Sequence, residues 1–179
     1  METEVKPAMA DYELRGEFPR ALVKKAGAAG FYGTVFPDSV GGVDMGFLAS
    51  AVVSEELARN DVRFAACNNQ QGSTCPQCIY AGGSVEQVMK FVPPLLAGET
   101  IGMMALTESG GGSDALGNMK TTAVRDGDVY RLNGSKMFAS MANETDVGIV
   151  LAKTDPDAGV KGVSAFIVEP KKYPGFDAR

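Results

Sequence analysis

The stretch Leu106-Thr107-Glu108-Ser109-Gly110-Gly111-Gly112-Ser113-Asp114 reads as a glycine-rich loop. It begins at the last residue of an apolar run, residues 101–106, that is typical of a strand. Its three successive glycines let the backbone approach a ligand closely and adopt positive φ. Their N–H groups can point together at a phosphate, and Thr107 and Ser113 add hydroxyls at the two ends of the loop. On this chemistry alone, a ligand-binding loop and an ordinary turn both remain open.

The loop differs from the common nucleotide-binding motifs. No Lys-Ser or Lys-Thr pair follows the glycines, so the loop is not a Walker P-loop. The next segment is strand-like rather than helical, which excludes a dinucleotide-binding βαβ fingerprint.

Upstream of the loop the chain has helical periodicity. Gly30 ends the first expected helix, Asp44 can cap the second, and Ser84 can cap the last. The segment between the last two helices is small, polar and cysteine-rich, and we interpret it as a helix with a polar face. The expected helices span residues 17–29, 45–59, 64–80 and 85–96.

Downstream of the loop the periodicity changes to alternation. Asp126-Gly127-Asp128 and Asn133-Gly134 are both hairpin signals. The expected strands span residues 101–106, 121–125, 129–132, 135–140, 147–153 and 162–169. Helices followed by strands predict an α+β fold, with an all-α N-terminal helical domain over residues 1–100. A truncated, antiparallel β-barrel-like middle domain is expected over residues 101–179.

Charge and composition exclude several classes of protein. The chain of 179 residues has a net charge of −5 and no basic cluster, which argues against a nucleic-acid surface. It contains no histidine, so Ser-His-Asp and Cys-His catalysis and every histidine-containing metal site are excluded. The N-terminus lacks the apolar segment of a signal peptide, and we expect a cytoplasmic protein.

Cys75 and Cys78 form a CxxC pair, with Cys67 nearby. A redox pair and half of a zinc site are the functional alternatives. Zinc would need two more ligands, and without histidine only Cys67 and a carboxylate remain. We therefore interpret the three residues as small buried or half-buried thiols and predict no metal site.

Ordered blocks along the chain resemble the acyl-CoA dehydrogenase family. Residues 105–114 (ALTESGGGSD) are similar to that family's Leu/Val-Thr-Glu-Pro-x-Ala-Gly-Ser-Asp signature. Residues 132–140 (LNGSKMFAS) resemble its Leu-Asn-Gly-x-Lys-x-(Trp/Phe)-Ile-Thr block. Further matching blocks lie at residues 18–19, 36–37, 41–42, 55–58, 93–99, 161–169 and 174–176, so the resemblance covers nearly the whole chain from residue 14 onward.

This resemblance implies FAD as cofactor and assigns residues to it. Thr107 would bond the flavin ring edge and Leu106 would pack against it, within a loop that runs from Met104 to Ser113 along FAD. Gly112 and Ser113 would approach the phosphates, and Ser113 would also lie near the acyl-CoA thioester arm. From the second block, Phe138 and Ala139 would line the ring, with the Ser140 hydroxyl near flavin N5.

Four positions depart from the family pattern. Ser109 stands in place of proline, Gly111 in place of alanine and Ser140 in place of threonine, while Met104 stands where an aromatic residue is common. None of these forbids FAD binding, but together they suggest a divergent subgroup.

The resemblance also implies an activity: α,β-dehydrogenation of an acyl-CoA thioester to 2,3-enoyl-CoA, with electrons passed to an electron-transfer flavoprotein. The catalytic glutamate, and most of a homotetramer core, are expected in a C-terminal helical domain beyond Arg179. No catalytic base is expected here, because Glu55, Glu56 and Glu99 do not match its position. Glu108 does not match either, and we interpret it as a structural hydrogen-bond acceptor.

Two alternatives remain open from the sequence. The chain could be a non-catalytic fragment or paralogue that acts only as an interaction module. It could also belong to an acyl-CoA oxidase or a flavin monooxygenase on the same scaffold. If it is a fragment, its sheet should have an unpaired edge and its helices should expose apolar faces. The polar residues 68–71 (NNQQ) favour a short or functionalised acyl group.

Overall fold

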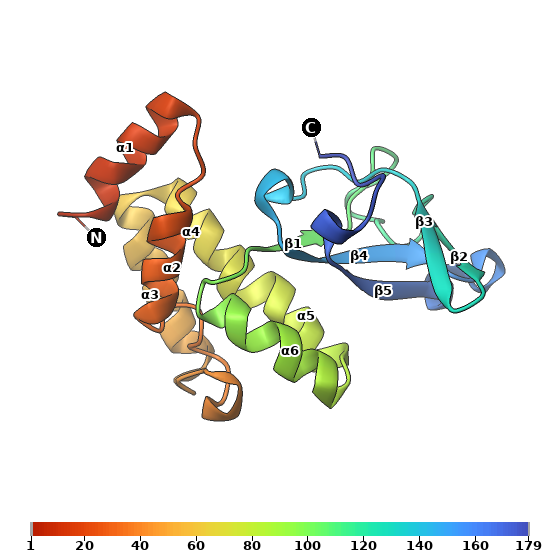
Figure 1. Ribbon diagram of the computed structural model, residues 1–179, viewed down its shortest axis with the longest axis horizontal. Helices are drawn as coiled ribbons and strands as arrows, with labels where there is room; N and C mark the ends of the chain where they lie inside the picture. The colour runs from red at the N-terminus through yellow and green to blue at the C-terminus, as the bar shows by residue number, and fades with distance from the viewer. Residues whose placement is uncertain (1, 179) are drawn as a thin grey trace.

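The computed structural model describes residues 2–178 as a helical half followed by a half built around one sheet (Figure 1). This arrangement confirms the expected α+β class. The helix α1, in the first 15 residues, was not among the expected helices. The helices are α1 (Val5–Arg15), α2 (Arg20–Ala28), α3 (Gly46–Asn60), α4 (Val62–Asn69), α5 (Cys75–Gly82) and α6 (Val85–Leu96).

The helix boundaries follow local capping chemistry. Ser84 begins α6 with a capping box: its hydroxyl accepts from the Gln87 N–H, and the Gln87 side chain accepts from the Ser84 N–H. Asp61 caps α4 in a similar way, by accepting from two backbone N–H groups. The expected cap at Asp44 is wrong, since α3 begins after Met45 without a side-chain cap and Asp44 itself has a φ of 47°.

A π-helical turn, Gln70–Thr74, joins α4 to α5, so residues 62–82 form the helical segment that the sequence predicted. Gln71 in this turn is fully buried. Its Nε2 donates to the carbonyl oxygens of Leu95 (3.2 Å) and Thr100 (2.8 Å), and its Oε1 accepts from the Gly102 N–H (2.7 Å). One side chain therefore connects α6 and the start of the sheet to the middle of the helical half.

The sheet is organised around its longest strand, β4, which pairs with three neighbours. β5 runs antiparallel to β4 on one side, while β1 and the start of β2 run parallel to it. β2 and β3 form the antiparallel hairpin predicted at Asp126-Gly127-Asp128. The strands are β1 (Gly102–Ala105), β2 (Thr122–Asp126), β3 (Val129–Asn133), β4 (Val147–Lys153) and β5 (Val163–Val168).

The pairing of the sheet corrects the expected antiparallel barrel. β1 lies parallel to β4, from Gly102 opposite Val147 to Ala105 opposite Val150. The connection between them contains the glycine loop and the β2–β3 hairpin, which is long enough to allow parallel pairing. Within the described residues the sheet is mixed and open, and β1, β3 and β5 each pair with one other strand only.

A strand expected over residues 135–140 is absent from the described structure. The Met137 N–H donates to the carbonyl of Thr107 (2.8 Å) in the glycine loop, rather than to a neighbouring strand. Phe138 adopts a φ of 59°, which is incompatible with an extended ladder. Tertiary contacts of this segment therefore override its alternating pattern.

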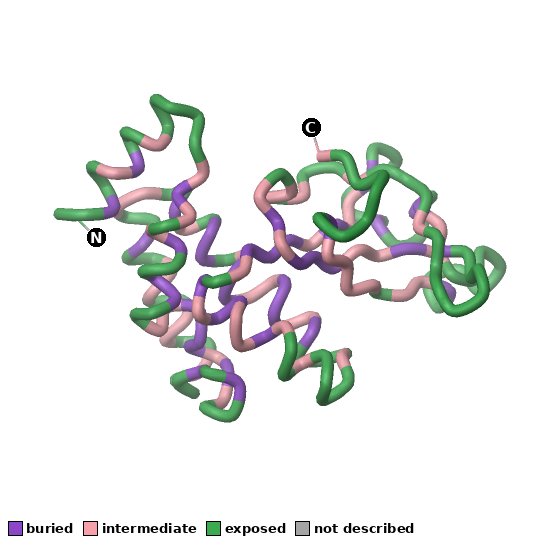
Figure 2. Tube along the Cα trace, in the orientation of Figure 1, coloured by how far each residue is buried: buried purple, intermediate pink, exposed green. Residues whose placement is uncertain are grey.

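One hydrophobic core runs through both halves (Figure 2). Val92 and Leu95 of α6 pack in the same cluster as Ile101, at the start of the sheet half, and Ile149 in β4. No helix within residues 2–178 has both the length and the apolar character needed to cross a bilayer.

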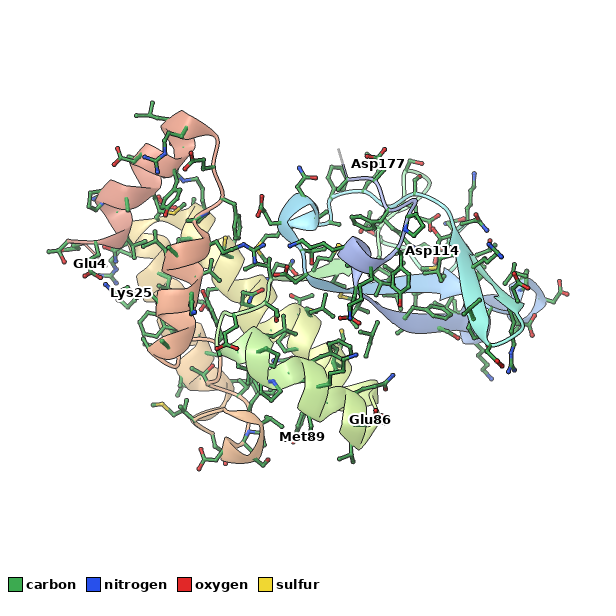
Figure 3. The ribbon with its side chains drawn as sticks, in the orientation of Figure 1. Glu4, Lys25, Glu86, Met89, Asp114 and Asp177 are labelled. Carbon is green, nitrogen blue, oxygen red and sulfur yellow. The ribbon has the colours of Figure 1, made fainter. Side chains whose placement is uncertain are left out.

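The helical half also exposes apolar side chains. Phe47, Leu48 and Val52 lie exposed on α3. On α6, Met89 points away from the sheet half (Figure 3). At the other end of the helical half, Glu4 pairs with Lys25 at 2.7 Å and joins α1 to α2 (Figure 3).

Replacing Gln71 by leucine should destabilise the whole chain. The variant leaves the Gly102 N–H and the Thr100 carbonyl without their partner in a buried site and removes one donor to the Leu95 carbonyl, which still accepts from the Gly98 N–H at 3.0 Å. We expect a loss of about 3 kcal/mol in the free energy of unfolding. Urea denaturation followed by circular dichroism measures this loss.

The matched control is Gln77→Leu, one turn or more further along the same helical segment, where the side chain is half-buried. We expect it to cost less than about 1 kcal/mol. Equal losses for the two variants would contradict the connecting role of Gln71.

Candidate functional site

The end of β1 places the first predicted site residues. Met104 lies within β1, half-buried, with its Sδ 3.9 Å from the Cys78 Sγ of α5. Leu106 and Thr107 follow the strand and are also half-buried. β1 packs against α5 and pairs with β4, so the loop begins from a rigid support.

Glu108, the next residue, is buried and held by four donors from three positions. Its carboxylate accepts from the Lys120 N–H (2.6 Å), the Thr121 N–H (3.0 Å) and the Thr121 hydroxyl (2.5 Å). It also pairs with the Lys136 ammonium at 2.8 Å, and the exposed fractions of the two side chains are only 7% and 9%. These contacts confirm that Glu108 is a structural acceptor.

The charge of Glu108 is stabilised by this cage. Burial by itself raises the pKa of the carboxyl group, but the hydrogen bonds from Lys136, Thr121 and the backbone N–H groups outweigh it and lower the pKa to about 2. The carboxylate is therefore ionised at neutral pH, with its oxygens already occupied. Such a group cannot act as the general base, which needs a free oxygen and a pKa near the working pH.

The glycines after Glu108 leave open space above the backbone. A β-carbon placed on Gly110 or Gly112 would meet no heavy atom within 4 Å. Gly112 and Ser113 are exposed, and the Gly111 N–H turns back to the Glu108 carbonyl at 3.2 Å. Asp114, in the sheet half (Figure 3), closes the loop by accepting from the Gly117 N–H and the Asn118 side chain.

Lys136 and Met137 lie beside the glycine loop. Besides the bond from the Met137 N–H to the Thr107 carbonyl, the Lys136 ammonium donates to the Leu106 carbonyl at 3.1 Å. Phe138 follows in a left-handed conformation, and the residue is 86% exposed. An exposed aromatic ring on backbone that costs about 1–3 kcal/mol to hold suggests a functional position.

Ala139 and Ser140 diverge from the glycine loop. Ser140 is exposed, and Ala139 lines a hollow of ≈ 420 Å³ together with Phe18, Met141 and Glu144. No hydrogen bond among residues 2–178 joins Gly112 or Ser113 to residues 138–140. The structure thus brings Leu106 and Thr107 next to the segment that carries Phe138, through the Met137 and Lys136 hydrogen bonds. The phosphate-side residues Gly112 and Ser113 and the ring-side residues 138–140 are linked indirectly, through Glu108 and these bonds at the start of the glycine loop.

Sequence reasoning missed the donors that hold the site together. It identified Glu108 as an acceptor but did not name Lys136 or Thr121. Lys136 could have been found, because it is the lysine of the Leu-Asn-Gly-x-Lys block that was quoted for the resemblance. Thr121 carries no comparable sequence signal.

The four polar residues that favoured a functionalised acyl group have different environments. Gln71 is committed to the backbone groups described above, and Asn68 is buried with its Nδ2 3.4 Å from the Ser54 hydroxyl. Asn69 is exposed, and Gln70 is half-buried. Two of the four therefore contribute to the interior of the helical half rather than to an open pocket.

The cysteines are free thiols, buried at Cys67 and Cys75 and half-buried at Cys78, as predicted. Burial raises the pKa of Cys75 to about 12, with a further contribution from the neighbouring Cys78. Burial also raises the pKa of Cys67 to about 11. The thiolate forms needed for redox or metal chemistry are therefore disfavoured at neutral pH.

Comparison with protein families gives two matches that together cover nearly the whole chain. Residues 1–99 match the family model "Acyl-CoA dehydrogenase, N-terminal domain". Residues 103–179 match the family model "Acyl-CoA dehydrogenase, middle domain".

Individual proteins are similar over the same length. A glutaryl-CoA dehydrogenase of Desulfococcus multivorans is 38% identical over 176 residues, which is 97% of this chain and 45% of that protein. CarC, a subunit of the caffeyl-CoA reductase–Etf complex of Acetobacterium woodii, is 38% identical over 161 residues, 90% of this chain and 42% of that protein.

The fold is shared with a solved structure, a glutaryl-CoA dehydrogenase from Mycobacterium smegmatis in complex with FADH2. It superposes with a TM-score of 0.87 at 34% identity, covering 99% of this chain and 44% of that one. The chain therefore spans less than half the length of each of these three relatives.

Replacing Glu108 by glutamine should destabilise the sheet half at neutral pH. The change leaves the Lys136 ammonium buried without its counter-charge, and we expect a loss of about 3–5 kcal/mol in the free energy of unfolding. The pH dependence is a second signature. Because the folded pKa lies below the ordinary 4.5, the stabilisation is complete above about pH 4.5 and is lost as the pH falls toward 2.

Urea unfolding between pH 7 and pH 2 measures both effects, and the difference between the wild type and the variant should shrink across this window. Glu99→Gln, at an exposed glutamate, is the control and should change stability by less than about 0.5 kcal/mol. A pH-independent difference for the Glu108 variant would argue against the ionised cage.

Proposed function

The chain belongs to the acyl-CoA dehydrogenase family, and on that premise we propose that it forms one wall of an FAD site in a protein that oxidises an acyl-CoA thioester to its 2,3-enoyl-CoA. The remaining wall is proposed to come from the part of the relatives that this chain does not cover. Within the chain, we propose a boundary between a helical and a middle domain near residue 100.

One observation carries the proposal. The Met137 N–H donates to the Thr107 carbonyl at 2.8 Å, which holds the glycine loop beside the segment of the exposed Phe138 ring. The sequence separates these residues by about 30 positions, and the resemblance assigns both segments to the same flavin ring. Had the two segments lain apart, the assignment would have failed.

The residues present fit FAD. An isoalloxazine ring requires an uncovered apolar or aromatic surface and a few directed hydrogen-bond groups, and the protein tunes the ring through them. Phe138 offers the uncovered aromatic ring, and Thr107 and Ser140 offer hydroxyls. The open space over Gly110 and Gly112 allows phosphates to approach backbone N–H groups without a side chain in the way.

Each residue then has a proposed role. Met104 and Leu106 present apolar surface, Thr107 bonds the ring edge, and Phe138 with Ala139 lines the ring. Ser140 would lie near the flavin ring, and Gly112 and Ser113 would hold the phosphates, with Ser113 also near the thioester arm. FAD, when bound, supplies the acceptor for the hydride that leaves the β-carbon.

Proton abstraction from the α-carbon is assigned to no carboxylate of this chain. Glu108 has no free oxygen, and Glu55 and Glu56 are exposed on α3 beside Arg59. We propose that the base lies in the uncovered part of the relatives. The contribution of this chain is to bind and orient the cofactor and to exclude water from one side of it.

For the electron acceptor we propose a second flavoprotein of the electron-transfer type, and for the natural assembly a homotetramer. The acceptor is supported by the similarity to CarC, which is a subunit of a complex with Etf. For the substrate we propose a short or functionalised acyl-CoA, supported by the similarity to a glutaryl-CoA dehydrogenase.

Removing the Phe138 ring should weaken FAD binding without affecting folding. Because the ring is exposed in the chain, Phe138→Ala should change the free energy of unfolding by less than about 0.5 kcal/mol. Loss of stacking should weaken FAD affinity by about 2 kcal/mol, or roughly 30-fold. Fluorescence titration with FAD measures the affinity.

Phe47→Ala is the matched control, since Phe47 is similarly exposed but lies on α3 in the helical half. It should leave FAD affinity unchanged within about twofold. Equal affinity of the Phe138 and Phe47 variants would remove the support for the ring-side assignment.

The activity itself is tested by turnover. With acyl-CoA substrates and an electron-transfer flavoprotein, the natural protein should reduce the acceptor and form enoyl-CoA without consuming oxygen. Oxygen uptake with peroxide release would identify an oxidase instead. A protein that binds neither FAD nor acyl-CoA would be an interaction module, and the proposal would be wrong.

A further inference from the structure

The segment that carries the ring-side residues is anchored at its far end by Arg20, the first residue of α2. One guanidinium nitrogen, Nη1, donates to Asp146 Oδ2 at 2.7 Å. The other, Nη2, donates to the backbone carbonyl of Glu144 at 2.6 Å and lies 3.5 Å from its carboxylate. Arg20 and Asp146 are 126 positions apart in the sequence, so this contact exists only in the folded chain.

The residue that Arg20 binds is itself fixed to the sheet. Asp146 Oδ2 also accepts from the Ile101 N–H at 2.8 Å, immediately before β1. Its other oxygen accepts from the Lys171 ammonium at 2.5 Å. The backbone N–H of Asp146 donates back to the Ile101 carbonyl at 2.8 Å. Arg20 thus joins α2 to the point where the ring-side segment enters β4.

From this anchor a short, tightly turned stretch leads back to the proposed flavin face. A single 3-10 turn, Ala142–Glu144, is preceded by Met141 in a left-handed conformation. The Glu144 N–H donates to the Met141 carbonyl at 3.0 Å, and the Ala142 N–H donates to the Ala139 carbonyl at 3.3 Å. Two turn hydrogen bonds therefore connect the anchored Glu144 back to Ala139, the middle of residues 138–140.

Residues just before α2 flank the same stretch. Phe18 lines the hollow that Ala139, Met141 and Glu144 also line. Within the described residues, the hydrogen bonds and ion pairs that connect the helical half (residues 2–100) to residues 138–146 all come from the Arg20 side chain. The direction of the ring-side segment relative to the helical half thus depends on the Arg20 side chain, on the Ile101 backbone groups that bond Thr145 and Asp146, and on apolar packing.

We propose that Arg20 is a positioning residue, which holds residues 138–146 so that Phe138 and Ser140 face the flavin. This inference rests on the proposed function. It adds a residue of the helical half, outside both signature blocks, to those that shape the cofactor site.

The guanidinium group suits this role better than an ammonium group would. Its two terminal nitrogens reach a carboxylate and a backbone carbonyl at the same time, in a fixed plane. A lysine at this position is a single point charge that can keep one of these partners. Arg20→Lys should therefore restore only part of what Arg20→Met loses.

The chain contains no tryptophan, so Phe138→Trp creates a single fluorescent reporter that keeps an aromatic ring at the ring-side position. In this background we would compare Arg20→Met, Arg20→Lys and the control Arg15→Met. Arg15 lies near the same end of the helical half and pairs with the exposed Glu17, so the control removes the same charge without touching residues 138–146.

Measurements are made at a temperature where circular dichroism shows every variant to be folded. The first readout is the dissociation constant for FAD, together with the absorption spectrum of the bound flavin. The second is the fluorescence anisotropy of the introduced tryptophan. Arg20→Met should weaken FAD binding by about tenfold, alter the bound flavin spectrum and lower the anisotropy. Arg20→Lys should fall in between, and Arg15→Met should stay within about twofold of the parent.

Failure of the inference and failure of the proposed function give different results. If the parent binds no FAD, the proposed flavin site fails, and the anisotropy alone decides the role of Arg20. If Arg20→Met and Arg15→Met have the same anisotropy and, where FAD binds, the same affinity and spectrum, Arg20 does not position the segment. A lower urea midpoint for Arg20→Met with unchanged anisotropy of the reporter would mean a merely structural anchor and would also overturn the inference.

Discussion

A buried carboxylate at Glu108 constrains the whole sheet half, because an ionised group in the interior must have all its hydrogen bonds satisfied. Its partners are Lys120 and Thr121, both in the loop directly before β2, and Lys136 in the segment after β3. The glycine loop, the hairpin and the ring-side segment therefore cannot move independently. Both ends of the glycine loop are therefore fixed, and only the glycines between them, which border open space, are free to change conformation.

The two halves are joined by polar side chains placed at the ends of elements, over a shared apolar core. Gln71 connects the π-helical turn to the end of α6 and the start of β1, and Asp146 gathers Arg20, Lys171 and the Ile101 N–H at the start of β4. Apolar packing supplies most of the stabilisation but little direction. These hydrogen bonds define how the helical half meets the sheet, and hence where the proposed flavin face lies.

Local patterns predicted most of the elements well. Ser84 begins α6 as expected, and Asp126-Gly127-Asp128 makes the expected hairpin between β2 and β3. The errors occur where distant residues compete with local preference. Residues 135–140 alternate like a strand, but their Met137 N–H bonds the Thr107 carbonyl instead of a neighbouring strand. β1 pairs in parallel with β4, and because a long connection separates them, hydrophobic periodicity does not predict this pairing.

The sequence by itself determined most of the helices and strands, the α+β class and the family, because periodicity, caps, turn residues and the order of motif blocks depend on residues close together along the chain. Only the tertiary structure decided the strand order, the donors around Glu108, the left-handed and exposed Phe138, and the reach of Arg20 to Asp146. Those features depend on residues that meet only when the chain is packed, with up to 126 positions between them. Their energies come from burial and hydrogen-bond geometry, which no local pattern encodes.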